Sequence, residues 1–120
     1  MATINNMEKK TLFQRIMERE IPAQIVHEDE WCIAFRDIAP KAPTHLLIVP
    51  RKPIPSLDAL MPEDASVVGH LFVVAKQLAA AEGLTNGYRT VFNCGQDAGQ
   101  TVFHLHLHLM GGRSFAWPPG

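Results

Sequence analysis

The sequence contains only two cysteines, Cys32 and Cys94, almost no net charge and no long apolar segment. The two cysteines lack the Cys-x-x-Cys spacing of a redox or zinc motif, so we expect reduced thiols rather than a disulfide. A formal net charge of −1 provides no general attraction for nucleic acid. No run approaches the ~18 apolar residues of a membrane span, and residues 1–10 lack an apolar targeting core. These absences predict a cytoplasmic protein that binds neither nucleic acid nor a membrane.

The composition is that of one ordinary globular domain. Of the 120 residues, 47% are hydrophobic and 19% are charged, which suffices for a core and argues against disorder. Residues 1–10 are polar and predicted to be a flexible N-terminus, and residues 11–120 are predicted to form a single domain.

Hydrophobic periodicity predicts two helices and five strands. A short helix is expected to begin at Thr11, where Gln14 completes a capping box, and a long helix is expected from Pro62 to Gly83. The predicted strands are residues 24–28, 31–35, 44–50, 88–93 and 102–110. Because most of the strands are consecutive, the pattern predicts an α+β fold with a five-stranded antiparallel sheet, one long helix and one short helix.

The last predicted strand carries histidines at alternate positions, namely His104, His106 and His108. At a strand period of two, they lie on one face and the intervening apolar residues lie on the other. The glycine-containing segment 95–101 precedes the strand, and small residues allow backbone amides to approach a bound anion. A neutral imidazole is a good nucleophile toward phosphorus. The stretch therefore predicts phosphoryl chemistry, with His106 as the nucleophile.

Two other interpretations of the histidines compete. A single histidine on a strand face is usually only a hydrogen-bonded polar side chain. A zinc site is disfavoured because His104 and His108 are about 13 Å apart along a strand, whereas each Zn–N bond is about 2 Å long. A zinc site made of two of these histidines and a distant ligand such as His45 remains an alternative, although it would leave the third histidine without a role.

Residues 104–110, His-Leu-His-Leu-His-Leu-Met, fit the histidine-triad motif of alternating histidines and apolar residues. Further matching segments are Asp37-Ile38, Ala42-Pro43-Thr44-His45, Asn93, Gly99-Gln100-Thr101 and Trp117-Pro118-Pro119-Gly120. From about residue 11 to its end, the chain resembles the Hint branch of the histidine-triad (HIT) superfamily, the purine nucleoside phosphoramidases. The resemblance implies a homodimer with a ten-stranded sheet, in which a docked C-terminal tail helps to shape the partner's site.

The resemblance also implies an activity, adenosine 5′-monophosphoramidase. His106 attacks the α-phosphorus of a purine 5′-phosphoramidate and expels the amine, and water hydrolyses the nucleotidyl-histidine to release AMP. No metal and no other cofactor is implied. The implied catalytic residues are His106, His104, His108, His45 and Thr101. The implied substrate-binding residues are Asp37, Ile38, Asn93, Gly99, Gln100, Thr101, His106, His108 and Trp117.

The resemblance and the chemistry assign a role to each group. His104 and His45 orient the nucleophile. His108, Thr101 and the amides of Gly99 and Gln100 stabilise the phosphoryl oxygens and the leaving group. Asp37 accepts hydrogen bonds from the ribose hydroxyls, Asn93 donates to a phosphate or ribose oxygen, and Phe13, Ile16 and Ile38 are expected near the base.

Three alternatives to this activity remain open. A dinucleoside polyphosphate hydrolase or a nucleotidyltransferase would use His106 with a different leaving group, although Thr101, Gly111-Gly112-Arg113 and the C-terminal Trp-Pro-Pro-Gly favour the Hint branch. A nucleotide-binding interaction module with little turnover would use the same residues. A zinc-binding protein is the third.

Overall fold

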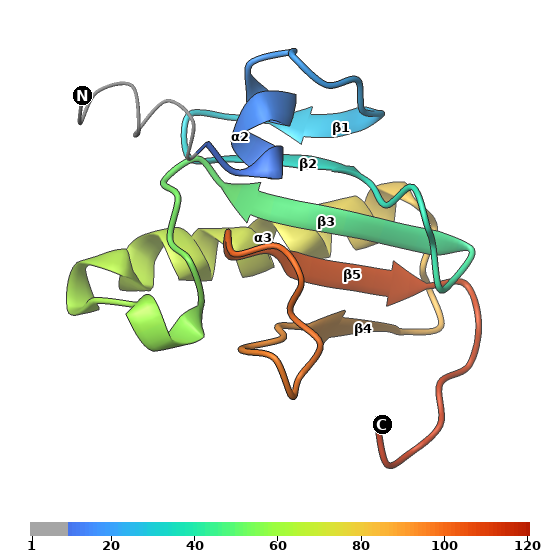
Figure 1. Ribbon diagram of the computed structural model, residues 1–120. Helices are drawn as coiled ribbons and strands as arrows, with labels where there is room; N and C mark the ends of the chain where they lie inside the picture. Colours follow the sequence, from blue (N-terminus) through green and yellow to red (C-terminus); the bar gives the residue numbers. More distant parts are fainter. Residues whose placement is uncertain (1–9) are drawn as a thin grey trace, which may run out of the picture.

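The computed structural model describes residues 10–120, so nearly all of the predicted flexible segment, residues 1–10, lies outside the described residues (Figure 1). Five strands form one sheet in the order β1-β2-β3-β5-β4, and every neighbouring pair is antiparallel. The strands are β1 (Ile25–Glu28), β2 (Cys32–Arg36), β3 (Thr44–Pro50), β4 (Tyr88–Val91) and β5 (Leu107–Gly111). The predicted α+β fold is confirmed.

Two helices cover opposite faces of the sheet (Figure 1). The short helix α2 (Leu12–Met17) begins with the predicted capping box between Thr11 and Gln14. The long helix α3 (Ala65–Ala81) follows two short 3₁₀ turns, Leu57–Ala59 and Pro62–Asp64, so the predicted start at Pro62 is a 3₁₀ turn rather than the α-helix itself. Gly83 ends α3 with φ of 73°, a left-handed conformation that glycine adopts without strain.

Alternation along the strands divides the core into two layers. Ala34, Leu46 and Ile48 pack with α3, whereas their neighbours Phe35, Leu47 and Val49 pack with α2. Strand β3 is buried along its whole length, as the nearly unbroken apolar run 44–50 predicts. The helix α2 layer is the one on which the candidate site lies. None of the helices formed by residues 10–120 is long and apolar enough to cross a membrane.

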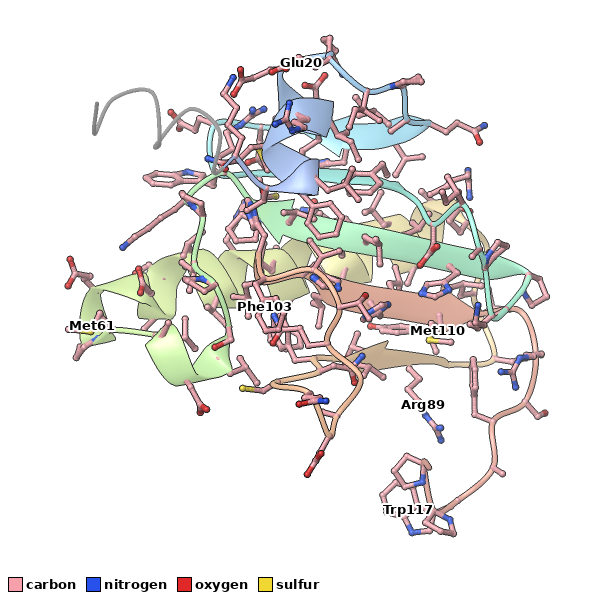
Figure 2. All side chains as sticks on the ribbon, viewed as in Figure 1. Glu20, Met61, Arg89, Phe103, Met110 and Trp117 are labelled. Carbon is pink, nitrogen blue, oxygen red and sulfur yellow. The ribbon has the colours of Figure 1, made fainter. Side chains whose placement is uncertain are left out.

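The predicted histidine strand, residues 102–110, is wrong in its first half. Strand β5 begins only at Leu107, so His108 alone lies on the strand, and residues 102–106 form an irregular segment. The segment leaves the ladder because its polar groups bond elsewhere: the Leu105 amide donates to the Ile54 carbonyl, at 2.6 Å, and the His104 ring bonds to the Pro50 carbonyl, at 2.7 Å. A consequence is that Phe103, predicted on the packed face, is exposed (Figure 2).

The C-terminal tail leaves the end of β5 and extends away from the sheet (Figure 1). The guanidinium groups of Arg89 and Arg113 lie 5.0 and 4.2 Å from the centre of the Phe115 ring, and Arg89 Nη2 donates to the Ala116 carbonyl. Trp117 lies beyond this anchor and is 83% exposed (Figure 2). Docking of the tail against a partner subunit stays a prediction.

Candidate functional site

A pocket of about 260 Å³ lies between α2, the end of β2 and the segment that leads into β5. Its lining comprises Leu12, Phe13, Ile16, Ile21, Pro22, Ala23, Phe35, Arg36, Asp37, Ile38, Leu47, Thr101, Val102, His106 and His108. A larger hollow, of about 550 Å³, is lined by residues 83–89 and 112–115. The larger hollow has no histidine, cysteine or carboxylate in its lining, so the smaller pocket is the candidate for chemistry.

His106 is held with one specific ring nitrogen free. Its Nδ1 atom lies 2.7 Å from the backbone carbonyl of His104. Because a carbonyl only accepts hydrogen bonds, Nδ1 carries the proton and the neutral ring has its lone pair on Nε2. Burial lowers the pKa of His106, which keeps the ring neutral at pH 7. The Phe13 ring packs edge-on against it, with centroids 4.9 Å apart. His106 is therefore an oriented, uncharged nucleophile on the wall of the pocket.

The His104 imidazole is fully buried and has a partner at each nitrogen. Nε2 donates to the Pro50 carbonyl at 2.7 Å, and Nδ1 accepts from the Thr11 hydroxyl at 2.7 Å. Thr11 Oγ1 in turn accepts from the Gln14 amide, which is the N-cap bond of α2. The ring thus fixes the backbone from which the His104 carbonyl reaches His106. The His104 backbone carbonyl, not its imidazole, thus bonds to His106.

His45 bonds to His108 rather than to the nucleophile. The Lys41 amide donates to His45 Nδ1 at 3.0 Å, so His45 Nε2 carries a proton and donates to His108 Nδ1 at 2.9 Å. Neutral His108 must then carry its own proton on Nε2. Burial lowers the pKa of His108 to about 4, and the neighbouring rings of His106 and His45 add to the shift. His108 therefore presents an uncharged N–H donor whose tautomer is set by His45.

Asp37 and Ile38 reach the same pocket from the end of β2. Asp37 Oδ1 accepts from the Ala39 amide, and Oδ2 lies 3.5 Å from His45 Nε2. Ile38 is 97% exposed. Thr101 also lines the pocket and is exposed. The structure thus brings together five predicted site residues: Asp37, Ile38, Thr101, His106 and His108.

The amides of Gly99 and Gln100, which are predicted to bind phosphoryl oxygens, form hydrogen bonds within their own turn in the structure. The Gly99 amide donates to the Gln96 carbonyl and the Gln100 amide donates to the Gly95 carbonyl, so the turn itself uses both donors. The buried Gln100 side chain donates to the carbonyls of Pro55 and Val102 and accepts from the Gly95 amide. Gly99 has φ of 87°, which suits glycine in such a turn. These residues shape the loop before Thr101 and do not line the pocket.

Two further predicted substrate-binding residues, Asn93 and Trp117, do not line this pocket either. Asn93 follows the end of β4 and is half-buried, and Trp117 lies at the far end of the tail (Figure 2). Sequence reasoning gave Thr11 only a capping role and gave Lys41 none. Neither contact has a local signal, because Thr11 and His104 are 93 positions apart and Lys41 acts through its backbone amide.

Comparison with known proteins gives consistent matches. The profile of the HIT domain matches residues 18–115. An uncharacterised HIT-like protein of Synechococcus elongatus is 56% identical over 114 residues, which is 95% of this chain and 100% of the relative.

Two solved structures are also similar. A HIT family hydrolase from Legionella pneumophila Philadelphia 1 has a TM-score of 0.90 and 50% identity, covering 92% of this chain and 100% of that chain. A HIT family hydrolase from Clostridium thermocellum has a TM-score of 0.87 and 40% identity, covering 90% of this chain and 95% of that chain.

Proposed function

This chain belongs to the HIT domain family, and from that premise we propose that it hydrolyses the P–N bond of adenosine and other purine 5′-phosphoramidates as a Hint-branch phosphoramidase. The observation that carries the proposal is the hydrogen bond that orients His106. Its Nδ1–H donates to the His104 carbonyl, which leaves Nε2 as a nucleophile in a pocket. Two similar solved structures are HIT family hydrolases, which supports a hydrolytic reaction.

The proposed reaction has two displacements at the α-phosphorus. His106 Nε2 forms a bond to phosphorus while the P–N bond to the amine breaks, and the departing nitrogen takes a proton from water. Water then attacks the nucleotidyl-histidine, the P–Nε2 bond breaks and AMP leaves. His108, whose free nitrogen is a neutral N–H donor, hydrogen-bonds a phosphoryl oxygen or the leaving group, and Thr101 adds a hydroxyl donor from the pocket lining. In this scheme the residues named supply the chemistry without a metal or another cofactor.

The pocket also suits a nucleoside. Its walls are mostly apolar, with Phe13, Ile16 and Leu47 available to contact a purine ring. Within residues 10–120, Asp37 Oδ2 has no hydrogen bond or ion pair shorter than its 3.5 Å approach to His45 Nε2, so it can accept hydrogen bonds from ribose hydroxyls. We assign Ile38, 97% exposed at the rim, to cover the bound base.

We further propose that the protein is a cytoplasmic homodimer. Strand β4 is an edge of the sheet, so two copies paired edge to edge would form ten strands. Apolar side chains flank this edge, because Tyr88 on β4 and Phe72 and Val73 on α3 are all exposed in one chain. Pairing also gives a place to the exposed Trp117, which would reach the partner's site. Free thiols at Cys32 and Cys94 suit a reducing compartment.

Intact-mass analysis after brief mixing with an adenosine phosphoramidate tests the reaction. Wild type should show a transient adduct of one adenylate and release AMP, and His106→Asn should show neither while still binding AMP. Gln77→Ala, on the exposed face of α3, is the matched control and should behave like wild type. Tight AMP binding without adduct or AMP release would instead indicate a binding module. Faster turnover of a dinucleoside polyphosphate than of the phosphoramidate would favour the other hydrolase or the transferase.

A further inference from the structure

A group of side chains of the types that bind metal ions lies outside the candidate active site, around the turn between β1 and β2. His27 Nε2 and His70 Nε2 each lie 2.7 Å from Asp29 Oδ2, and Cys32 Sγ lies 3.6 Å from the same oxygen. The donor atoms of His27, Asp29 and Cys32 all lie within 4.8 Å of one another. Three donor atoms of the hairpin turn therefore form one cluster, and His70 of α3 reaches this cluster through its contact with Asp29 Oδ2.

We propose that His27, Asp29, Cys32 and His70 bind one divalent transition-metal ion, with Zn²⁺ as the preferred ion. Two imidazoles, a carboxylate and a thiolate complete the four-coordinate shell that is typical of structural zinc sites. In a tetrahedral site with ordinary bond lengths, nitrogen and oxygen ligands are about 3.3 Å apart, and sulfur and oxygen about 3.6 Å. The Cys32–Asp29 distance already has this value, and each imidazole would retreat from Asp29 Oδ2 by about 0.6 Å. His70 must also move closer to the other ligands, because its donor atom lies more than 4.8 Å from at least one of them.

Hydrogen bonds around Asp29 orient its carboxylate for this role. Oδ1 accepts from the amides of Trp31 and Cys32, at 2.7 and 2.8 Å, which leaves Oδ2 facing the two histidines and the thiol. The Asp29 carbonyl accepts from Arg51 Nε at 2.7 Å, which ties the turn to the end of β3. Metal ligands in proteins are commonly held by such outer hydrogen bonds, and the turn is therefore shaped before an ion binds.

Access and charge balance also fit a bound ion. The side chains of His27, Asp29 and His70 are 25%, 25% and 32% exposed, so an ion can enter from solvent, whereas Cys32 closes the site from the core. On binding, the thiol loses one proton and each imidazole carries its proton on Nδ1, which frees both Nε2 atoms. A dication with one carboxylate and one thiolate is electrically neutral, which suits a half-buried site.

The proposed metal site is separate from the nucleotide pocket. Cys32 belongs to the α3 layer of the core, whereas the pocket is lined from the α2 layer. The β1–β2 turn lies at the end of the sheet where β3 finishes (Figure 1). The ion is therefore inferred to hold the hairpin against α3. Its binding can be measured independently of the enzyme activity proposed above.

Titration of the full-length, metal-stripped protein with Co²⁺ and then Zn²⁺ tests the site. Tetrahedral cobalt–thiolate coordination gives intense visible bands and a near-ultraviolet charge-transfer band. We expect both to saturate at one equivalent per chain and to disappear when Zn²⁺ displaces Co²⁺. Absence of a charge-transfer band at one equivalent would overturn the proposal.

Variants locate the ion. His70→Ala and His27→Ala remove half-exposed ligands, and Cys32→Ser removes the thiol; each should weaken Zn²⁺ binding by about 100-fold or more, since loss of an outer partner alone costs about 10- to 100-fold. Cys94→Ser is the matched control and should bind as wild type does. Circular dichroism shows whether each variant is folded, and the two histidine variants keep the test valid if Cys32→Ser is not. Unchanged binding in both histidine variants, or loss of binding in His45→Ala alone, would overturn the assignment.

Discussion

The hydroxyl of Thr11 connects the start of α2 to the active-site backbone, so replacing Thr11 with valine should affect both stability and catalysis. In the structure this one oxygen donates to His104 Nδ1 and accepts from the Gln14 amide. Valine keeps the shape of threonine but removes both bonds. Loss of an N-cap costs about 1 kcal/mol, and an unsatisfied buried polar atom costs about 1–3 kcal/mol. The expected decrease in the free energy of unfolding is therefore about 3 kcal/mol.

Urea denaturation of wild type, Thr11→Val and Thr11→Ser measures this change. Serine keeps the hydroxyl, so it should stay within about 0.5 kcal/mol of wild type. The catalytic consequence follows from the His104 carbonyl, which fixes His106 Nδ1 at 2.7 Å. A shift of that backbone should lower kcat by about 10- to 100-fold, because small misplacements of reacting groups are costly. A valine variant as stable and as active as the serine variant would refute the reasoning.

Three more predictions concern the core, the histidine pair and pH. Leu107 is fully buried between the sheet and α3, so Leu107→Ala should lower the free energy of unfolding in urea by about 2–5 kcal/mol. The control, Leu12→Ala at an exposed position, should change it by less than about 1 kcal/mol. His45→Ala frees the His108 tautomer, so steady-state kinetics should show a lower kcat, and in a double-mutant cycle with His108→Ala the two losses should be less than additive. Burial lowers the pKa of His108 from 6.5 to about 4, so the unfolded chain binds the proton first as pH falls. The stability that His108 contributes is thus present above pH 6.5 and lost between pH 6.5 and 4. In urea titrations at several pH values, His108→Gln should remove that part of the pH dependence. An unchanged slope of the free energy of unfolding against pH would contradict this prediction.

Local patterns in the sequence determined much of the fold. The bounds of β3, the capping box at Thr11 and the end of α3 at Gly83 all agree with prediction, because each depends on residues within one or two turns of chain. The alternation in residues 102–110 correctly placed histidines beside a pocket but not on one strand, since the bonds from this segment to Pro50 and Ile54 compete with the sheet ladder. The glycine loop also looked like an anion cradle, although its amides close the turn instead.

Tertiary structure alone decided which nitrogen of each histidine is free. The sequence supplied the imidazoles, yet the tautomer of His106 depends on the His104 carbonyl, that of His108 depends on His45, and that of His104 depends on the Pro50 carbonyl. The convergence of His70 with the β1–β2 turn is likewise invisible in the sequence, where 41 positions separate it from Asp29. Periodicity reports which face a residue occupies, because that follows from local backbone geometry. Which side chains meet across elements follows from how the sheet and the helices pack, and that is where the chemistry of this protein is set.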